Sequence, residues 1–328
     1  HRAGALPIER DAPFARRQRG ADLVADEREP RREPHVDDLR RLYARYGFNQ
    51  ALKDLEGANG APAPVADDAR GGLRSTQAGY ARSAASESEA PDPALSAPGT
   101  YETVSTPEQL AAWIERLAAA GEFAFDTETD SLDAMRANLV GLSFSTEPGN
   151  GCYVPVGHTY PGAPAQLDLR DTLDALRPLL ESATHRKLGQ HGKYDLHVLR
   201  RHGVAVAGYH DDTMLESFVW NASASRHDMD TLAKRYLGYD TIKFEDVAGK
   251  GAKQIPFSEV AIDDATRYAA EDADITLRLH RVLSAKLAGE PALEQVYREI
   301  EMPLVPVLAR MEAFAAPLLM SDDQVGVA

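Results

Sequence analysis

The sequence predicts a mixed α/β layer fold, and three observations support this prediction. Strand-like apolar runs lie near 122–128, 138–145 and 151–156, separated by turn residues such as Asn138 and Gly149. Apolar residues at helical spacing dominate the chain after them. Of the 328 residues, 43% are hydrophobic, which is enough for a real core. Strands followed mainly by helices are typical of a sheet that helices cover.

The first hundred residues are predicted to lie outside the compact fold. Residues 1–35 are rich in Arg, Asp and Glu and poor in large apolar residues, so we expect no independent structure there. Apolar residues at near-helical spacing predict one helix within 35–57. Residues 58–98 are dominated by Ala, Gly, Pro and Ser, as in a flexible linker. The compact domain should begin near Thr100, and a first residue other than Met suggests a fragment of a longer chain.

Inside the compact region, the sequence predicts the helices and strands in the following order. Thr106 and Pro107 are typical of a helix N-cap and first turn, and predict a helix to Ala120. The three strands named above then predict an antiparallel meander. A leucine stripe predicts a helix over 169–180, and Lys187–Gly189 reads as a short strand. Further helices are predicted over 192–202, 211–221, 228–237 and 258–287.

Composition excludes several classes of protein. The formal net charge of −15 argues against a broad basic surface for nonspecific binding of nucleic acid, although metal ions can offset carboxylates where phosphate docks. The single cysteine, Cys152, rules out an internal disulfide. No apolar run approaches the ~18 residues of a membrane span, and no secretory signal is visible.

Asp126 and Glu128 form the most informative pattern in the chain. On a strand they share one face with Ala124, whereas Phe123 and Phe125 point to the other. Two neighbouring carboxylates repel each other unless a cation lies between them, and hard cations such as Mg²⁺ prefer oxygen ligands. The alternative interpretation is a solvated strand end at a turn.

Two more acidic residues, Asp195 and Asp272, are candidates for the same site. Asp195 lies near the start of a predicted helix, where an acidic residue is common simply because it favours the helix dipole. Tyr268 and Asp272 are four residues apart on a mostly apolar helix face, and a buried carboxylate there requires a cation partner. The alternative is that Tyr268 is ordinary core and that Asp272 pairs with Arg226 or Arg267.

In this order, the acidic positions and the tyrosine resemble the three motifs of the DEDD exonuclease superfamily in its tyrosine variant. The surrounding sequence, which includes FDTETDSL from Phe125, is similar to the bacterial DNA polymerase I family (family A). The similarity extends over the 3′–5′ proofreading domain of that family and the beginning of its polymerase domain. The resemblance covers about 100–312 and is specific because it is an ordered series. The matching segments are Phe125–Leu132, Asn138–Phe144, Asp212–Ser217, Arg226–Asp230, Ala248–Gly251, Tyr268–Asp274 and Ile300–Pro306.

The resemblance implies a ribonuclease H-like α/β fold with a mixed five-stranded sheet, and a set of catalytic residues. Asp126, Glu128, Asp195 and Asp272 would hold two divalent metal ions, with Asp126 bridging both. The ions would be Mg²⁺, with Mn²⁺ or Zn²⁺ as substitutes. Tyr268 would orient the attacking water through its hydroxyl, and hydrolysis by two metals requires no side chain that is a strong base.

The resemblance also implies substrate contacts. Leu132 and Phe244 would pack on the terminal bases of a frayed strand, a contact that is indifferent to base sequence. Gln190 and Arg226 would contact the strand as well, and so would His191, which stands where the family has Asn. Taken alone, Phe244 also fits a core aromatic.

The implied function is a metal-dependent 3′–5′ exodeoxyribonuclease that acts on single-stranded or frayed 3′ ends of DNA in replication and repair. The enzyme would be a monomer in the bacterial cytoplasm, associated with the nucleoid and not with a membrane. Palm and finger regions of a polymerase are missing, so we expect no polymerisation. Alternatives are an RNA-trimming DEDD exonuclease and a catalytically inactive DNA-binding module. The implied parts are a 5′-nuclease remnant (1–57), a linker (58–98), the exonuclease domain (99–288), the start of a polymerase domain (289–312) and a non-matching tail (313–328).

Overall fold

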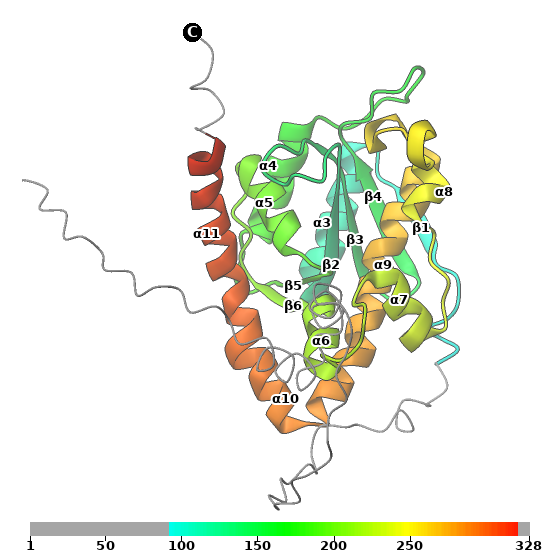
Figure 1. Ribbon diagram of the computed structural model, residues 1–328. Helices are drawn as coiled ribbons and strands as arrows, with labels where there is room; N and C mark the ends of the chain where they lie inside the picture. Colours follow the sequence, from blue (N-terminus) through cyan, green and yellow to red (C-terminus); the bar gives the residue numbers. More distant parts are fainter. Residues whose placement is uncertain (1–91, 321–328) are drawn as a thin grey trace, which may run out of the picture. The chain divides into compact units, whose positions relative to one another are not determined.

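The computed structural model describes residues 92–320, and the helix predicted within 35–57 lies outside them. Its centre is a mixed six-stranded sheet with the strand order β1-β4-β3-β2-β5-β6 (Figure 1). The strands are β1 (Thr100–Thr103), β2 (Glu122–Thr129), β3 (Leu139–Glu147), β4 (Asn150–Pro155), β5 (Arg186–Gly189) and β6 (Tyr209–Asp212).

The predicted meander is confirmed, because β2 pairs antiparallel with β3 and β3 pairs antiparallel with β4. The other three strands, β1, β5 and β6, all pair in parallel. The sheet therefore has six strands where five were expected. The two strands at its edges are four residues long, too short for an alternating pattern to stand out. The predicted helix over 211–221 begins only at Thr213, because Asp211 and Asp212 end β6.

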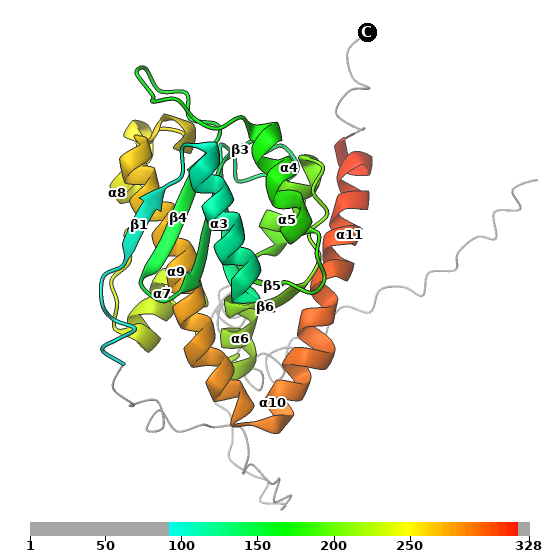
Figure 2. The same cartoon turned by 180° about the vertical axis from the view of Figure 1, so that it is seen from behind.

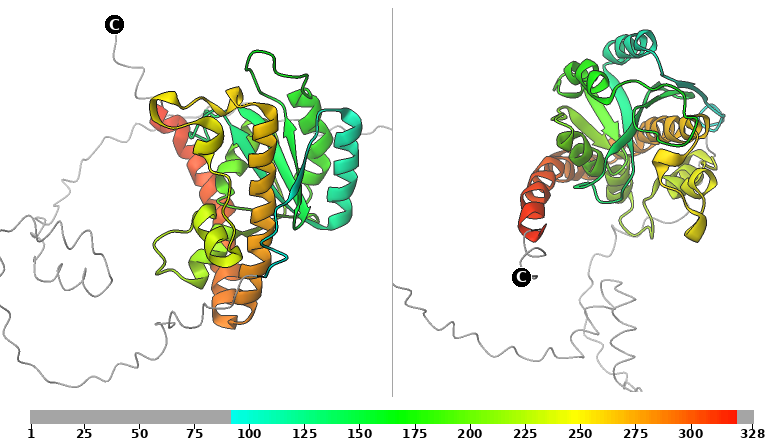
Figure 3. Two further views of the ribbon diagram at one scale, coloured as in Figure 1. Left: turned by 90° about the vertical axis from the view of Figure 1, so that its right-hand side faces the viewer. Right: turned by 90° about the horizontal axis from the view of Figure 1, so that it is seen from above.

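Helices cover both faces of the sheet, as Figures 2 and 3 show. One face carries α3 (Pro107–Ala120), α4 (Leu169–Leu180) and α5 (Lys193–Arg201) over the larger apolar core. The other face carries the long helix α9 (Ile262–Ala288). The shorter elements on the side of α9 are α6 (Thr213–Trp220), α7 (Met229–Leu232), the π-helical turn η2 (Ala233–Leu237), α8 (Phe244–Ala248), and the 3₁₀ turns η3 (Gly251–Lys253) and η4 (Phe257–Glu259).

The described residues end in a helical hairpin, with α9 as its first arm and a second arm that no periodicity had predicted. After α9 come α10 (Pro291–Val296), the π-helical turn η5 (Tyr297–Glu301) and α11 (Met302–Met320). The second arm of this C-terminal hairpin is the continuous helical segment 291–320, which runs back along the molecule beside α5 (Figure 1). The segment 313–320, predicted as a non-matching tail, continues α11 without a break. Within residues 92–320 no helix is both long and apolar enough to cross a membrane.

Local sequence signals explain several helix ends. Thr106 caps α3, and its side chain and that of Gln109 form a reciprocal capping box, with Pro107 in the first turn. Gly121 ends the helix in the left-handed conformation, at φ 70°. Asp168 caps α4 by accepting two backbone hydrogen bonds. The helix predictions over 169–180, 192–202 and 258–287 are confirmed to within a few residues at each end.

The buried ion pair between Asp274 and Arg278 attaches the entering chain to α9. Both side chains are 0% exposed, and Asp274 also accepts hydrogen bonds from Tyr101 and from the backbone of Gly149. The guanidinium of Arg278 donates to the carbonyl oxygens of Leu95 and Ala97, at 2.9 and 2.6 Å. The domain boundary near residue 99 stays a prediction, but residues just before it already contact α9.

We expect a protein that starts at residue 92 to be as stable as the full chain, whereas one that starts at residue 100 should lose about 1–3 kcal/mol of unfolding free energy. The reason is that Arg278 loses two carbonyl acceptors while its guanidinium stays buried. Urea unfolding of both truncated proteins measures the difference. Equal stability of the two would contradict this role for residues 92–99.

Candidate metal centre

Three carboxylates from the sheet and the long helix meet at the end of β2. Asp126 and Glu128 project from the face of β2 that α9 covers, because Ala124 on that same face packs against Leu277 of α9. Asp272 comes from α9 itself. One oxygen from each carboxylate lies within 4.8 Å of one from each of the others. The structure thus brings together three of the residues that the resemblance assigns to metal binding, and that role stays a prediction.

Among residues 92–320, no ion pair with a protein cation offsets the negative charge of these three carboxylates. Glu128 is nevertheless only 8% exposed and Asp272 only 7%. One carboxylate oxygen of Glu128, Oε1, is buried without a hydrogen-bond partner. Because a buried unpaired charge is costly, this donor set of hard oxygens fits a divalent cation.

The proposed pairing of Asp272 with an arginine is wrong. Arg226 lies 2.7 Å from Asp228 instead, and Arg267 pairs with Asp264 on the exposed side of α9. Both arginines are mostly exposed, whereas Asp272 is buried. The second alternative, a solvated strand end for Asp126 and Glu128, also disagrees with the structure, because Glu128 is buried.

The carboxyl groups of this site are less acidic than usual. Burial, more than any other cause, raises the pKa of Asp126 to about 7. Burial also raises the pKa of Glu128 and that of Asp272 well above their usual values, and the nearby charge of Asp126 adds to both shifts. A bound cation would reverse these shifts by favouring the ionised carboxylates.

Asp195 approaches the same site from the opposite face of the sheet. It lies on α5, and its Oδ1 accepts hydrogen bonds from the backbone N–H of Thr127, at 3.1 Å, and from the Thr127 hydroxyl. Burial first, and then the charge of Asp126, raises the pKa of Asp195 well above its usual value. Asp195 is therefore close to the three clustered carboxylates but does not belong to their tight group.

Tyr268 lies one helical turn before Asp272 and makes a hydrogen bond to its carboxylate. Burial and the charge of Asp272 raise the pKa of the Tyr268 hydroxyl, so this group stays protonated and acts as a hydrogen-bond donor. The ring packs against Phe244 and Phe257, with ring centroids 6.2 and 5.9 Å away.

The expected substrate-contact residues lie at several places around this site. Leu132 follows β2 and is fully exposed, and Phe244 is 38% exposed while stacked on Phe257. Gln190 uses its amide internally, since it donates to the His227 carbonyl at 2.9 Å and accepts from the Thr213 hydroxyl.

His191 has φ 58°, the only positive φ at a non-glycine residue in the part of the chain that the structure describes. Its backbone N–H donates to the carboxylate of Asp212 at 3.1 Å, and this hydrogen bond helps to hold the left-handed turn in place. Asn tolerates this conformation better than most residues and His is also enriched in it, which accounts for His at a position where Asn was expected.

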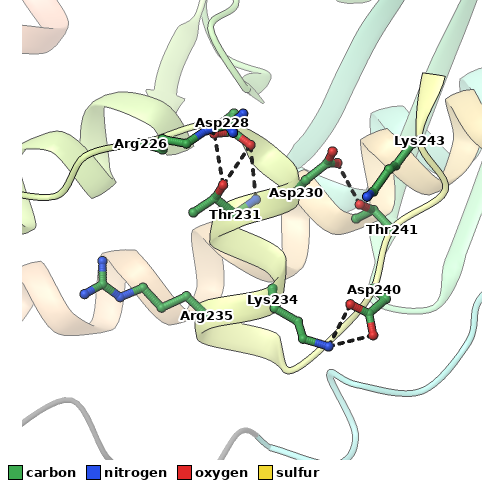
Figure 4. Close-up of a pocket in the computed structure, with 9 residues that line it drawn as sticks. All are labelled: Arg226, Asp228, Asp230, Thr231, Lys234, Arg235, Asp240, Thr241 and Lys243. Atoms are coloured by element: carbon green, nitrogen blue, oxygen red, sulfur yellow. Dashed lines mark hydrogen bonds and ion pairs between the residues drawn. The ribbon is translucent and has the colours of Figure 1, made fainter. Parts of the chain in front are cut away.

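Arg226 lines a cavity of about 470 Å³ beside α7 and η2, and Figure 4 shows it with its neighbours. The cavity contains none of the four site carboxylates, so it is separate from the candidate metal centre. Two of its cations are already paired, Arg226 with Asp228 and Lys234 with Asp240. The charge of Asp230, which lines this cavity, adds a minor share to the raised pKa of Asp272.

A second cluster, formed by Glu122, Asp211 and His280, also has the spacing of metal ligands. Its charge is offset by the protein, however. Arg186 contacts both carboxylates, at 3.1 and 3.0 Å, and Arg298 contacts Asp211 at 2.5 Å. This cluster is therefore a salt-bridge network and not a metal centre.

Sequence reasoning missed two residues that shape the site. Thr127 holds Asp195, yet its sequence position between two carboxylates indicates only a strand residue. Glu271 accepts hydrogen bonds from the Tyr239 hydroxyl and the Ile242 backbone, at 2.7 and 2.6 Å, and so fixes the segment that leads to Phe244. In the sequence, only its position next to Asp272 connects Glu271 with the site.

The chain is similar in sequence to known exonuclease domains and DNA polymerases. A family model described as a 3′–5′ exonuclease matches residues 101–288. DNA polymerase I of Pseudomonas aeruginosa is 51% identical over 234 residues, which are 71% of this chain and 26% of that protein. DNA polymerase I of Rhizobium leguminosarum is 44% identical over 230 residues, or 65% of this chain and 22% of that protein. The chain thus spans about a quarter of the length of these relatives.

Solved structures give a further likeness. The POL domain of Pol1 from M. smegmatis, in complex with DNA primer-template and dNTP, is 21% identical, with a TM-score of 0.50 over 64% of this chain and 32% of that chain. Escherichia coli RNase D, an exoribonuclease involved in structured RNA processing, is 18% identical, with a TM-score of 0.47 over 64% of this chain and 50% of that one. At these identities the likeness to the Pol1 domain concerns the fold alone.

Proposed function

The chain belongs to the 3′–5′ exonuclease family of DNA polymerase A, and from this premise we propose that it removes nucleotides from single-stranded or frayed 3′ ends of DNA with the help of divalent metal ions. The fold is the expected ribonuclease H-like α/β class, with six strands in its sheet. One observation above all supports the proposal: Asp126, Glu128 and Asp272 converge with no ion-paired cation from the described residues, while Glu128 keeps an unpartnered buried oxygen.

The four carboxylates would divide the work of binding the metal. Asp126, Glu128 and Asp272 would hold one ion, and Asp126 with Asp195 would hold the second. Bound divalent ions supply an activated water and stabilise the negative charge on the leaving 3′ oxygen. We propose that the ions are Mg²⁺, with Mn²⁺ or Zn²⁺ as substitutes, because the ligands are all hard oxygens.

The remaining side chains would position the substrate and the water. The Tyr268 hydroxyl stays protonated, so it can orient a water next to Asp272 by hydrogen bonding. Leu132 and Phe244 present exposed apolar surface to terminal bases, which suits an enzyme that accepts any nucleotide. Arg226 would attract the phosphate backbone from the cavity that it lines, and Gln190 and His191 would contact the strand from the other side.

The experiment that tests this function uses single-stranded DNA and RNA of one sequence, each labelled at the 5′ end. With Mg²⁺ present, the protein should shorten the labelled DNA one nucleotide at a time, and EDTA should stop the reaction. A preference for RNA would favour the RNA-trimming alternative. Binding of DNA without any shortening, in Mg²⁺ and in Mn²⁺, would favour the inactive DNA-binding module.

The retained carboxylates weigh against that inactive module. All four are present, and three of them lie together. An inactive descendant has no reason to keep a buried cluster of like charges, which destabilises the metal-free fold. The RNA-trimming alternative has less support than the DNA enzyme, because the relatives that match at high identity are DNA polymerases.

The wider context of the chain is also part of the proposal. By the resemblance to DNA polymerase I, residues 289–312 would be the start of a polymerase domain and 1–57 the end of a 5′-nuclease region. The enzyme would act as a monomer in the bacterial cytoplasm, near the nucleoid. Size-exclusion chromatography with light scattering tests the oligomeric state.

We expect Tyr268→Phe to lower turnover about 10- to 100-fold while changing DNA affinity less than about twofold. The substitution keeps the ring that packs on Phe257 and removes only the hydroxyl that bonds to Asp272. Single-turnover rates in Mg²⁺ and oligonucleotide binding in Ca²⁺ separate the two effects. A loss of binding with an unchanged chemical step would show that Tyr268 is a packing residue.

A further inference from the structure

Helix α5 presents two functional faces. Asp195 and Tyr194 point towards β2, where Asp195 meets Thr127 and Tyr194 meets Thr129. Lys193, Leu196 and His197 have the i, i+3, i+4 spacing of a single helix face, which contacts the C-terminal hairpin. The residue that serves the metal centre thus lies on a helix whose other face is covered by a different part of the chain.

Glu312 of α11 makes the main polar contact with that face. Its Oε1 pairs with the Lys193 ammonium, and its Oε2 lies 2.9 Å from Nε2 of His197, whose side chain is only 5% exposed. Burial raises the pKa of the Glu312 carboxyl, but the hydrogen bonds from Lys193 and His197 outweigh it and bring this pKa below its usual value. The carboxylate is therefore ionised and bound to both partners at neutral pH.

Apolar packing continues the same contact. Leu196, the residue after Asp195, packs against the buried cluster of the C-terminal hairpin. That cluster contains Tyr297, Met302 and Val305, together with Leu287 at the end of α9. Figures 1 and 2 show α11 beside α5 from both sides of the molecule.

The hairpin also reaches the turn before α5. The Tyr297 hydroxyl accepts a hydrogen bond from the backbone N–H of Asp212, at 2.9 Å. The Asp212 carboxylate in turn accepts the backbone N–H groups of His191 and Gly192, at 3.1 and 3.0 Å. These amides lie immediately before the first residue of α5. Contacts from the hairpin therefore converge on both the start and the outer face of this helix.

Helix α5 needs such support, because its own sequence specifies its position weakly. It has nine residues, and no side chain caps its first turn at Gly192. Helices of this length are marginal in isolation, and tertiary contacts supply most of their stability. On the side of α5 that faces β2, the hydrogen bonds to Asp195 come from Thr127.

We propose that Glu312 is a positioning residue of the nuclease, which holds α5 so that Asp195 stays at the metal centre. The start of the polymerase region is then a structural part of the exonuclease site and not merely a neighbour of it. This inference rests on the proposed function, because it assigns Asp195 to metal binding. Glu312 does not touch the metal site itself.

A simpler explanation is that Glu312 forms an ordinary surface ion pair. Its side chain is 43% exposed, and such pairs contribute little to stability. The two explanations differ in what they predict for metal affinity. A surface pair would change neither the binding of metal nor the metal dependence of hydrolysis, whereas a positioning residue changes both.

The test compares Glu312→Ala and Glu312→Gln with the unchanged full chain and with Glu299→Ala. Glu299 lies on the same hairpin and accepts a hydrogen bond from Gln295 of that hairpin, at 2.9 Å, so it serves as a matched control. Electron paramagnetic resonance measures Mn²⁺ binding to the substrate-free proteins. Hydrolysis of a 5′-labelled single-stranded DNA is followed as a function of Mg²⁺, and thermal melting in EDTA reports on folding.

We expect Glu312→Ala to weaken the weaker Mn²⁺ site about 3- to 10-fold and to raise the half-saturating Mg²⁺ concentration by a similar factor. Turnover at saturating Mg²⁺ should stay within about twofold, and Glu312→Gln should recover part of the Mn²⁺ affinity because it keeps one acceptor oxygen for one of the two partners. Glu299→Ala should behave like the unchanged protein.

Superimposable Mn²⁺ isotherms for the unchanged protein and Glu312→Ala would overturn the inference, and so would an equal effect of Glu299→Ala. Should Glu312→Ala melt before the assay temperature, the Glu312→Gln isotherm decides in the same way. If the unchanged protein neither binds Mn²⁺ nor hydrolyses DNA, the proposed function fails. If it does both and the Glu312 variants match it, only the role of Glu312 fails.

Discussion

Replacing Asp126 by alanine should lower exonuclease activity by at least about 10³-fold, a loss of roughly 4 kcal/mol or more in transition-state stabilisation. Asp126 belongs to the tight cluster with Glu128 and Asp272, and its charge also acts on Asp195. The charge of Asp126 acts on each of the other three carboxylates, so its loss should disturb the whole site.

The same substitution should leave the metal-free protein as stable as before or more so. It removes one of four carboxylates that repel each other, and no cation in the described part of the chain loses its partner. Hydrolysis of labelled DNA and thermal melting in EDTA measure the two effects. Asp171→Ala, on an exposed position of α4, is the control for a lost aspartate. Substantial activity in a well-folded Asp126→Ala protein would contradict the assignment of the site.

The second large effect concerns pH. The pKa of Asp126 is raised to about 7 in the metal-free fold, from an ordinary value of ~3.9 in an unfolded chain. Between these two values the folded protein binds more protons than the unfolded chain. The free energy of unfolding should therefore fall as the pH rises from about 4 to about 7, by up to about 4 kcal/mol from this group. Divalent metal should restore the lost stability at pH 8, because it favours the ionised carboxylates.

Melting temperatures in EDTA, from pH 5 to pH 8, test this expectation against Asp126→Asn as the matched variant. Glu216 also has a pKa raised by burial to about 7, so the unchanged protein contains more than one contribution of the same sign. The difference between the two proteins removes the contribution of Glu216 and reports on Asp126 together with its effect on the neighbouring carboxylates. The unchanged protein should lose more stability than Asp126→Asn as the pH rises. Parallel curves would show that Asp126 titrates normally.

The parts of the site that follow from local spacing were accessible to sequence reasoning. The strand period placed Asp126 and Glu128 on one face, and the helix period placed Tyr268 one turn from Asp272. Only the fold brings these two patterns together across the interface between β2 and α9. The resemblance supplied that step, because no spacing in the sequence states which helix covers which strand.

Features that depend on distant contacts were not accessible in the same way. The edge strands β1 and β6 are short, and their pairing depends on neighbours far away in the sequence. Glu312 lies 115 positions after His197, and nothing local marks either residue as a partner of the other. Likewise, the exposure of Arg226 and Arg267 is decided by packing, so the sequence left open a pairing with Asp272 that the fold excludes.

The most direct test of the central claim is to locate bound metal. Crystals of the protein soaked in Mn²⁺, with a nucleoside monophosphate as product, should be measured at a wavelength where manganese scatters anomalously. We expect anomalous peaks in contact with Asp126, Glu128 and Asp272, and a further peak between Asp126 and Asp195. No peak at these carboxylates in a protein that degrades DNA, or a peak only at Glu122, Asp211 and His280, would contradict the account.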